Sequence, residues 1–100
     1  MQTVPLKLVT IVAETVLIDH LSADLTRLGA KGYTVTEARG EGSRHLRAGE
    51  IPGVNAKLES VVSPAVADRI VEHVAQTYFS HYAVIVYVLD VGVVRGEKYV

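Results

Sequence analysis

The sequence predicts an α+β fold in which two helices cover one face of a four-stranded antiparallel sheet. Three features of the 100 residues support this fold class. Four short runs are rich in β-branched and apolar residues, as strands are, and two longer segments repeat apolar residues every three or four positions, as helices do. These segments follow one another as strand, helix, strand, strand, helix, strand. A glycine-rich segment separates the two middle strands.

The first three elements are a strand, a helix and a second strand. Residues 6–13 form a β-branched, mostly apolar run, which is typical of a strand buried on much of both faces. A set of leucines then recurs with spacings of four, four and three, which predicts an amphipathic helix that ends at Gly29 or Gly32. These leucines are Leu17, Leu21, Leu25 and Leu28. Residues 33–38 alternate and contain several β-branched side chains, so they are the second strand.

The last three elements are a strand, a helix and a final strand. Residues 54–62 alternate between an apolar and a charged face, which predicts the third strand. Ser63 and Pro64 then form a strong helix start, because the serine caps free N–H groups and the proline occupies the first position, where no N–H is missed. The expected buried stripe is Val66, Ile70, Val74 and Tyr78, and the expected outward set is Asp68, Arg69, Glu72 and His73. Residues 83–89 are the most apolar stretch and predict a central strand, and residues 92–100 predict a short edge strand.

This βαββαβ order is the ferredoxin-like arrangement, with both helices on one face of the sheet. Residues 6–13 and 83–89 are apolar on both faces, yet two helices can cover only one face. The other face is then an apolar surface of the size that marks an interface. We therefore expect the chain to associate with itself through its sheets.

The composition restricts the class of protein. One hundred residues form a single domain, residues 1–100. The formal net charge is −1 and no basic face is visible, which argues against nucleic-acid binding. No apolar run approaches the roughly 18 residues of a membrane span, so direct membrane insertion is not expected. The chain has no cysteine and no recognisable leader, so we expect a cytoplasmic protein.

The glycine-rich segment, residues 40–53, has the composition of an anion-binding loop. Glycines let backbone N–H groups turn toward an anion, Ser43 adds a hydroxyl, and Arg44 and Arg47 can each present a planar fork to phosphate or carboxylate oxygens. The alternative is a flexible connection, because polar glycine-rich loops are common and Gly-x-Gly alone has little specificity.

Several motifs together resemble PII-like signalling proteins. They are residues 29–35 (Gly-Ala-Lys-Gly-Tyr-Thr-Val), residues 40–44 (Gly-Glu-Gly-Ser-Arg), Arg47, and residues 78–83 (Tyr-Phe-Ser-His-Tyr-Ala). Within that family the sequence looks most like the carboxysome-associated PII-like proteins and the SbtB-type regulators linked to bicarbonate transport. The resemblance implies a homotrimer of ferredoxin-like subunits whose sheets face the threefold axis.

The resemblance also implies ligands. Members of the family bind adenine nucleotides in clefts between subunits, under the base of a long T-loop that here corresponds to residues 40–53. The nucleotide-binding residues that it implies are Gly40, Gly42, Ser43, Arg44, Arg47, Tyr82, Ala83 and Val84. The bicarbonate-binding residues that it implies are Gly40, Glu41, Gly42 and Arg47. AMP and ADP are the expected effectors, with ATP and cyclic AMP as further candidates. The chain departs from many relatives at Glu41, where they have a lysine, and at Val84, where they have a glycine.

The implied activity is regulation without catalysis. The T-loop would report the bound nucleotide to a membrane transporter or a carboxysome-associated protein, and so regulate inorganic-carbon uptake or carboxysome metabolism. No catalytic residue is expected: Asp19 with Asp24 and Glu37 with Glu41 could be drawn as acid pairs, but surface solvation accounts for them better. The alternatives are a phosphate-ester or acyl-phosphate hydrolase on the same fold and a CutA-like metal-responsive trimer. The histidines lack the spacing of a metal site, so no metal cofactor is expected.

Overall fold

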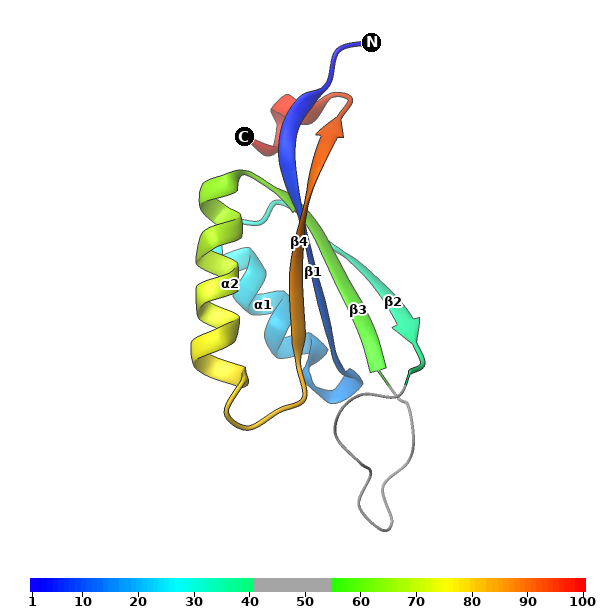
Figure 1. Cartoon of the computed structure of the whole chain (residues 1–100), viewed down its shortest axis with the longest axis vertical. Helices are drawn as coiled ribbons and strands as arrows, with labels where there is room; N and C mark the ends of the chain where they lie inside the picture. Colours follow the sequence, from blue (N-terminus) through cyan, green and yellow to red (C-terminus); the bar gives the residue numbers. More distant parts are fainter. Residues whose placement is uncertain (41–54) are drawn as a thin grey trace.

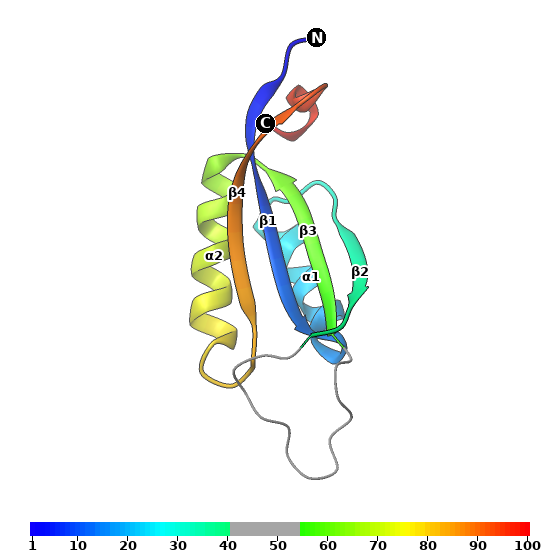
Figure 2. The same ribbon diagram turned by 45° about the vertical axis from the view of Figure 1, so that its right-hand side comes forward.

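The computed structural model describes residues 1–40 and 55–100 of the chain. It confirms the predicted fold class: a four-stranded antiparallel sheet with order β2-β3-β1-β4. Both helices lie against the same face of this sheet (Figures 1 and 2). The elements are β1 (Val4–Glu14), the 3-10 helix η1 (Thr15–Leu17), α1 (Ile18–Leu28), β2 (Thr34–Ala38), β3 (Asn55–Val62), α2 (Pro64–Tyr78), β4 (Ile85–Val93) and the 3-10 helix η2 (Gly96–Tyr99).

Two of the predicted strand positions are wrong. The apolar strand β4 is at an edge of the sheet and not at its centre, because it pairs with β1 alone. One face of β4 is apolar because it packs toward the helices, and the other face is apolar although no helix covers it. Residues 92–100 form no separate edge strand: β4 continues to Val93, and the chain then turns through Arg95, whose φ is 63°, into η2.

Both helices begin or end at the residues that the sequence marks. The α1 helix ends at Gly29, one of the two expected glycines. Gly29 has a φ of 113°, a backbone angle that residues with a Cβ rarely adopt. The α2 helix begins after Ser63, whose Oγ accepts a hydrogen bond from the backbone N–H of Val66 at 3.3 Å. Pro64 follows at the first helical position, as predicted.

The core lies between the helices and one face of the sheet. Alternate residues of β1 and β3 point into it, so that Ile11 and its partner Leu58 are both completely buried. The helices contribute the expected stripes, which include Leu21, Leu25, Ile70 and Val74. Buried leucine, isoleucine and valine side chains each contribute about 1.5–3 kcal/mol to folding.

The opposite face of the sheet, which we call the open face, is apolar and uncovered. Its apolar residues lie at alternate positions of β1, β3 and β4, namely Leu8, Val12, Val61, Ile85, Tyr87 and Leu89, and the same rows also contain Thr10, Lys57 and Glu59. Ile85, Tyr87 and Leu89, which follow one another along this face of β4, are 57%, 41% and 53% exposed, and such a row of exposed large side chains is unusual. The expected apolar face is therefore present. Of the helices that the described residues form, none is long and apolar enough to cross a membrane.

Candidate functional site

The predicted nucleotide-binding segments meet at one end of the sheet. This is the lower end in Figure 1, where β1 and β2 finish, β3 begins and α2 turns into β4. Asn55, the first residue of β3, pairs with both Glu14 at the end of β1 and Ala38 at the end of β2. Arg39 and Gly40 follow β2 and are exposed. The fold thus places the start of the predicted T-loop at this end.

The structure describes only part of the predicted site. Gly40, Tyr82, Ala83 and Val84 are described. Glu41, Gly42, Ser43, Arg44 and Arg47, which carry the phosphate and bicarbonate predictions, lie outside the described residues. Those residue assignments stay predictions.

The turn between α2 and β4, residues 79–84, has a defined backbone. The carbonyl of Tyr78 accepts hydrogen bonds from the N–H groups of His81 at 3.1 Å and Tyr82 at 2.9 Å. The ring of Tyr82 is 41% exposed, whereas Val84 packs against the core. Because the Val84 side chain is committed to the core, the turn can offer a ligand the Tyr82 ring, main-chain groups and the small surface of Ala83.

A single chain does not bring these residues into contact with Gly40. Gly40 follows the edge strand β2, Val84 precedes the opposite edge strand β4, and β3 and β1 lie between them. At the usual spacing of neighbouring strands this separation is about 14 Å. The two groups share one end of the sheet but opposite edges of it.

Sequence reasoning missed a cluster of polar side chains beside this turn. Asp24 of α1 accepts hydrogen bonds on Oδ2 from the hydroxyl of Tyr78 at 2.5 Å and from Nε2 of His73 at 2.9 Å. Its Oδ1 lies 3.5 Å from Nη2 of Arg27, and Nδ1 of His73 lies 3.4 Å from Oγ1 of Thr77. The interpretation of Asp24 as solvated surface and of His73 as outward-facing is therefore wrong, because each side chain is only about a fifth exposed, 20% and 22%.

The sequence did contain a signal for this cluster. Position 24 is three residues after Leu21 and four before Leu28, so it lies on the apolar side of α1. A carboxylate there needs a partner, and a buried tyrosine hydroxyl needs one too. Asp24 and Tyr78 satisfy each other across the two helices.

The electrostatics of the cluster follow from this geometry. Burial acts to raise the pKa of the Asp24 carboxyl, but the hydrogen bonds from Tyr78 and His73, the charge of His73 and the bond from Arg27 outweigh it and lower that pKa below 3.8. Burial, the hydrogen bond to Asp24 and the negative charge of Asp24 raise the pKa of Tyr78 to about 12. Asp24 is thus an ionised acceptor and Tyr78 a protonated donor at neutral pH.

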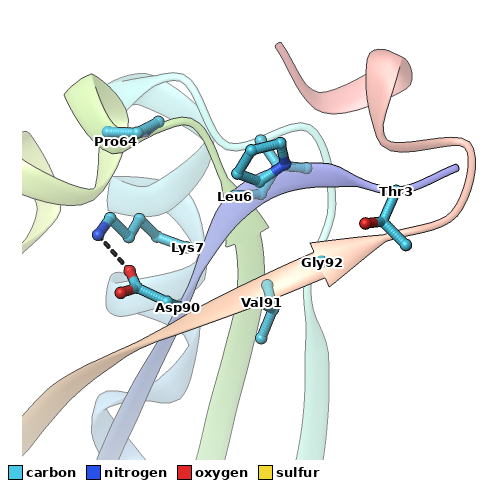
Figure 3. A pocket seen from close by; sticks show the side chains of 8 residues that line it. Thr3, Leu6, Lys7, Pro64, Asp90, Val91 and Gly92 are labelled. Carbon is cyan, nitrogen blue, oxygen red and sulfur yellow. Dashed lines mark hydrogen bonds and ion pairs between the residues drawn. The ribbon is translucent and has the colours of Figure 1, made fainter.

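The described residues also enclose two shallow hollows at the other end of the sheet. One, of about 550 Å³, lies between the start of β1, the end of β4 and Pro64, and the ion pair of Lys7 with Asp90 crosses it (Figure 3). The other, of about 440 Å³, is lined by residues that include Tyr33, Ser60 and Tyr99. Neither hollow contains a predicted nucleotide-binding residue. Within the part of the chain that the structure describes, no three His, Cys, Asp or Glu side chains are placed to hold a metal ion.

Comparison with known proteins gives a consistent result. Residues 6–98 match the model of the family described as nitrogen regulatory protein P-II. A PII-like signaling protein from Thermus thermophilus is 59% identical over the full length of both chains, and its crystal structure superposes with a TM-score of 0.87.

A second similar protein carries ligands. The CPII protein from Thiomonas intermedia is 25% identical, the match covers 99% of this chain and 98% of that one, and the TM-score is 0.85 for its structure with ADP, AMP and acetate. Its structure with ADP and bicarbonate has the same identity and coverage and a TM-score of 0.83.

Proposed function

The chain belongs to the nitrogen regulatory protein P-II family, and from that premise we propose that it is a non-enzymatic regulatory protein that binds adenine nucleotides. The observation that carries this proposal is CPII, which matches this chain over almost its full length and has been solved with ADP and AMP. AMP and ADP are the expected ligands, with ATP and cyclic AMP as further candidates.

The proposed assembly is a homotrimer formed through the open face. Its support is the row of exposed apolar side chains on β4, among them Ile85 and Leu89. In such an assembly the edges of neighbouring sheets meet, and a cleft between subunits suits a site whose residues lie at opposite edges of one sheet. Light scattering at micromolar concentration is expected to give the mass of a trimer, and Ile85→Asp, which would bury an unpaired carboxylate, is expected to abolish it. A wild-type monomer contradicts this assembly.

In the proposed site the loop binds the phosphates. Gly40, Gly42, Ser43, Arg44 and Arg47 surround them. Tyr82, Ala83 and the main chain of Val84 line the adjoining side of the cleft. A charge-assisted arginine–phosphate bond in a partly desolvated cleft contributes about 1.5–3 kcal/mol. Arg47→Ala is therefore expected to weaken ADP binding by roughly tenfold to a hundredfold, and His45→Ala much less.

Bicarbonate is the second proposed effector, because CPII has been solved with it. Gly40, Glu41, Gly42 and Arg47 are its proposed contacts. The physiological role that we propose is control of inorganic-carbon uptake or carboxysome-linked metabolism in the cytoplasm, through a transporter or carboxysome-associated partner that reads the T-loop. A ligand achieves this by stabilising one loop conformation over others.

Calorimetric titration with AMP, ADP, ATP and cyclic AMP, with and without bicarbonate, tests the proposal. We expect binding of at least one nucleotide and no more than trace turnover when ATP, ADP or an acyl phosphate is incubated with the protein. The matched controls are Arg47→Ala and His45→Ala. Absence of nucleotide binding contradicts the proposed function, and steady hydrolysis would indicate the hydrolase alternative.

A further inference from the structure

A continuous chain of contacts runs from the middle of α1 to the turn that carries Tyr82. Asp24 accepts the hydroxyl hydrogen of Tyr78, and the Tyr78 ring lies 6.0 Å from the Tyr82 ring, tilted by 51°. The ring of His81 also lies near the Tyr82 ring, with centroids 6.5 Å apart in an edge arrangement. The Tyr82 ring therefore lies against two neighbours, and Asp24 fixes one of them.

This arrangement matters because α2 ends without a left-handed residue such as the Gly29 that closes α1. The residue after Tyr78 is Phe79, which keeps a helical conformation with φ of −60° and ψ of −32°, so no glycine stops the helix. The N–H groups of His81 and Tyr82 both bond to the carbonyl of Tyr78. The position of Tyr78 thus sets both the main chain and the ring of Tyr82.

The charges around Asp24 favour a single arrangement of this cluster. From α2, His73 and Tyr78 donate to its Oδ2; from its own helix, Arg27 approaches Oδ1. A carboxylate with several donors is held more rigidly than one with a single partner, and charge-assisted bonds are the stronger kind.

We propose that Asp24 is a positioning residue for nucleotide binding: by holding Tyr78 it fixes the place of Tyr82 beside the nucleotide. This inference rests on the proposed function, since Tyr82 is one of the predicted nucleotide-binding residues. Asp24 itself touches no ligand. Its effect passes through one hydrogen bond and one pair of packed rings.

The test labels the protein with 3-fluorotyrosine and records fluorine NMR without nucleotide, with the Tyr82 signal assigned from Tyr82→Phe. We expect the Tyr82 signal to move or broaden in Asp24→Ala and in Tyr78→Phe. Asp24→Asn keeps an oxygen acceptor for the Tyr78 hydroxyl and is expected to restore most of the wild-type signal. Asp19→Ala, which removes an exposed carboxylate of the same helix, is the matched control and should change nothing.

Titration with ADP follows on the same variants. Asp24→Ala and Tyr78→Phe should each weaken ADP binding by a factor of about 2 to 10. Asp24→Ala combined with Tyr78→Phe should be no weaker than either alone, because both remove the same bond.

A Tyr82 signal that stays at its wild-type position in folded Asp24→Ala and Tyr78→Phe overturns the inference. The inference is also overturned if the losses of ADP affinity of Asp24→Ala and Tyr78→Phe add up in the double variant. If the wild-type protein binds no ADP, the proposed function and the effect on affinity both fail, while the fluorine signal still decides whether Asp24 places Tyr82.

Discussion

The two ends of α2 are held in different ways. At its start, Ser63 caps the helix through a bond to the N–H of Val66, three residues away. At its end, the helix is held by Tyr78, whose hydroxyl bonds to Asp24, 54 residues away in the sequence. The side-chain bond at the first end joins close neighbours along the chain, whereas the side-chain bond at the second end joins two helices. A capping residue such as Ser63 fixes where a helix begins. A contact between helices, such as that of Tyr78 with Asp24, can also hold the helix against the turn that carries Tyr82.

The largest expected effect comes from removing the tertiary anchor altogether. Tyr78→Ala deletes a ring that is only 6% exposed, so we expect a loss of about 3–5 kcal/mol in the free energy of unfolding. Phe79→Ala is the control, because Phe79 is the next residue yet 49% exposed, and its loss should be well below that of Tyr78→Ala. Urea denaturation followed by circular dichroism measures both. Equal losses would show that the end of α2 is not anchored through Tyr78.

The next effect comes from removing only the polar part of the anchor. Asp24→Ala leaves Tyr78 and His73 without their acceptor and should cost about 1.5–3 kcal/mol at neutral pH. Because the folded-state pKa of Asp24 lies below 3.8, its contribution is present above that pH and is lost as the pH falls through the lowered value. The variant should therefore lose less stability than the wild type as the pH is lowered through 3.8 and the range just below it. Parallel acid curves for the two proteins would contradict this.

The local end of α2 should give a smaller loss. Ser63→Ala removes the cap and is expected to cost about 1 kcal/mol. Ser63→Asp, which keeps an acceptor and adds a charge that suits a helix start, should retain the stability of the wild type. Thermal unfolding of the three proteins is the measurement. A loss with Ser63→Ala as large as that with Tyr78→Ala would remove the contrast between the ends.

The most specific effect is seen only at high pH, where Tyr78 loses its proton. The pKa of Tyr78 is raised to about 12 from 10.0, so its contribution is complete below pH 10 and disappears as the pH rises through about 12. Difference absorbance of the phenolate should show one tyrosine that titrates late, and Asp24→Asn should shift its pKa back toward 10.0 because the negative charge is gone. If the late-titrating group persists in Asp24→Asn and vanishes only in another tyrosine variant, the anchor has been assigned to the wrong ring.

The same contrast explains which features the sequence could predict. Ser63, Pro64 and Gly29 act through adjacent residues, and their roles were confirmed. The βαββαβ order was also confirmed, because periodicity is a local property. The place of β4 was predicted wrongly, since a run that is apolar on both faces can be a central strand or an edge strand with an uncovered face.

In the candidate site, too, the sequence could not predict contacts between residues that are far apart along the chain. Tyr82 was predicted from a motif, but no pattern links it to Asp24, because the connection passes through two helices and a ring contact. Arg44 and Arg47 were predicted to bind phosphate from residue type and motif alone, and they lie outside the described residues, so this stays a prediction.

Gly96 has a consequence for the extent of the open face. A Cβ at this position would lie 2.7 Å from the Cβ of Val4 and 3.2 Å from Cδ1 of Leu6, so η2 approaches β1 as closely as a backbone can. Leu6 belongs to the same row as Leu8, yet it is only 2% exposed because η2 covers it. The chain thus closes one end of its own apolar surface. The apolar part that stays uncovered consists of Leu8, Val12 and the exposed side chains of β4 beside them, and it extends toward the end of the sheet where β2 finishes.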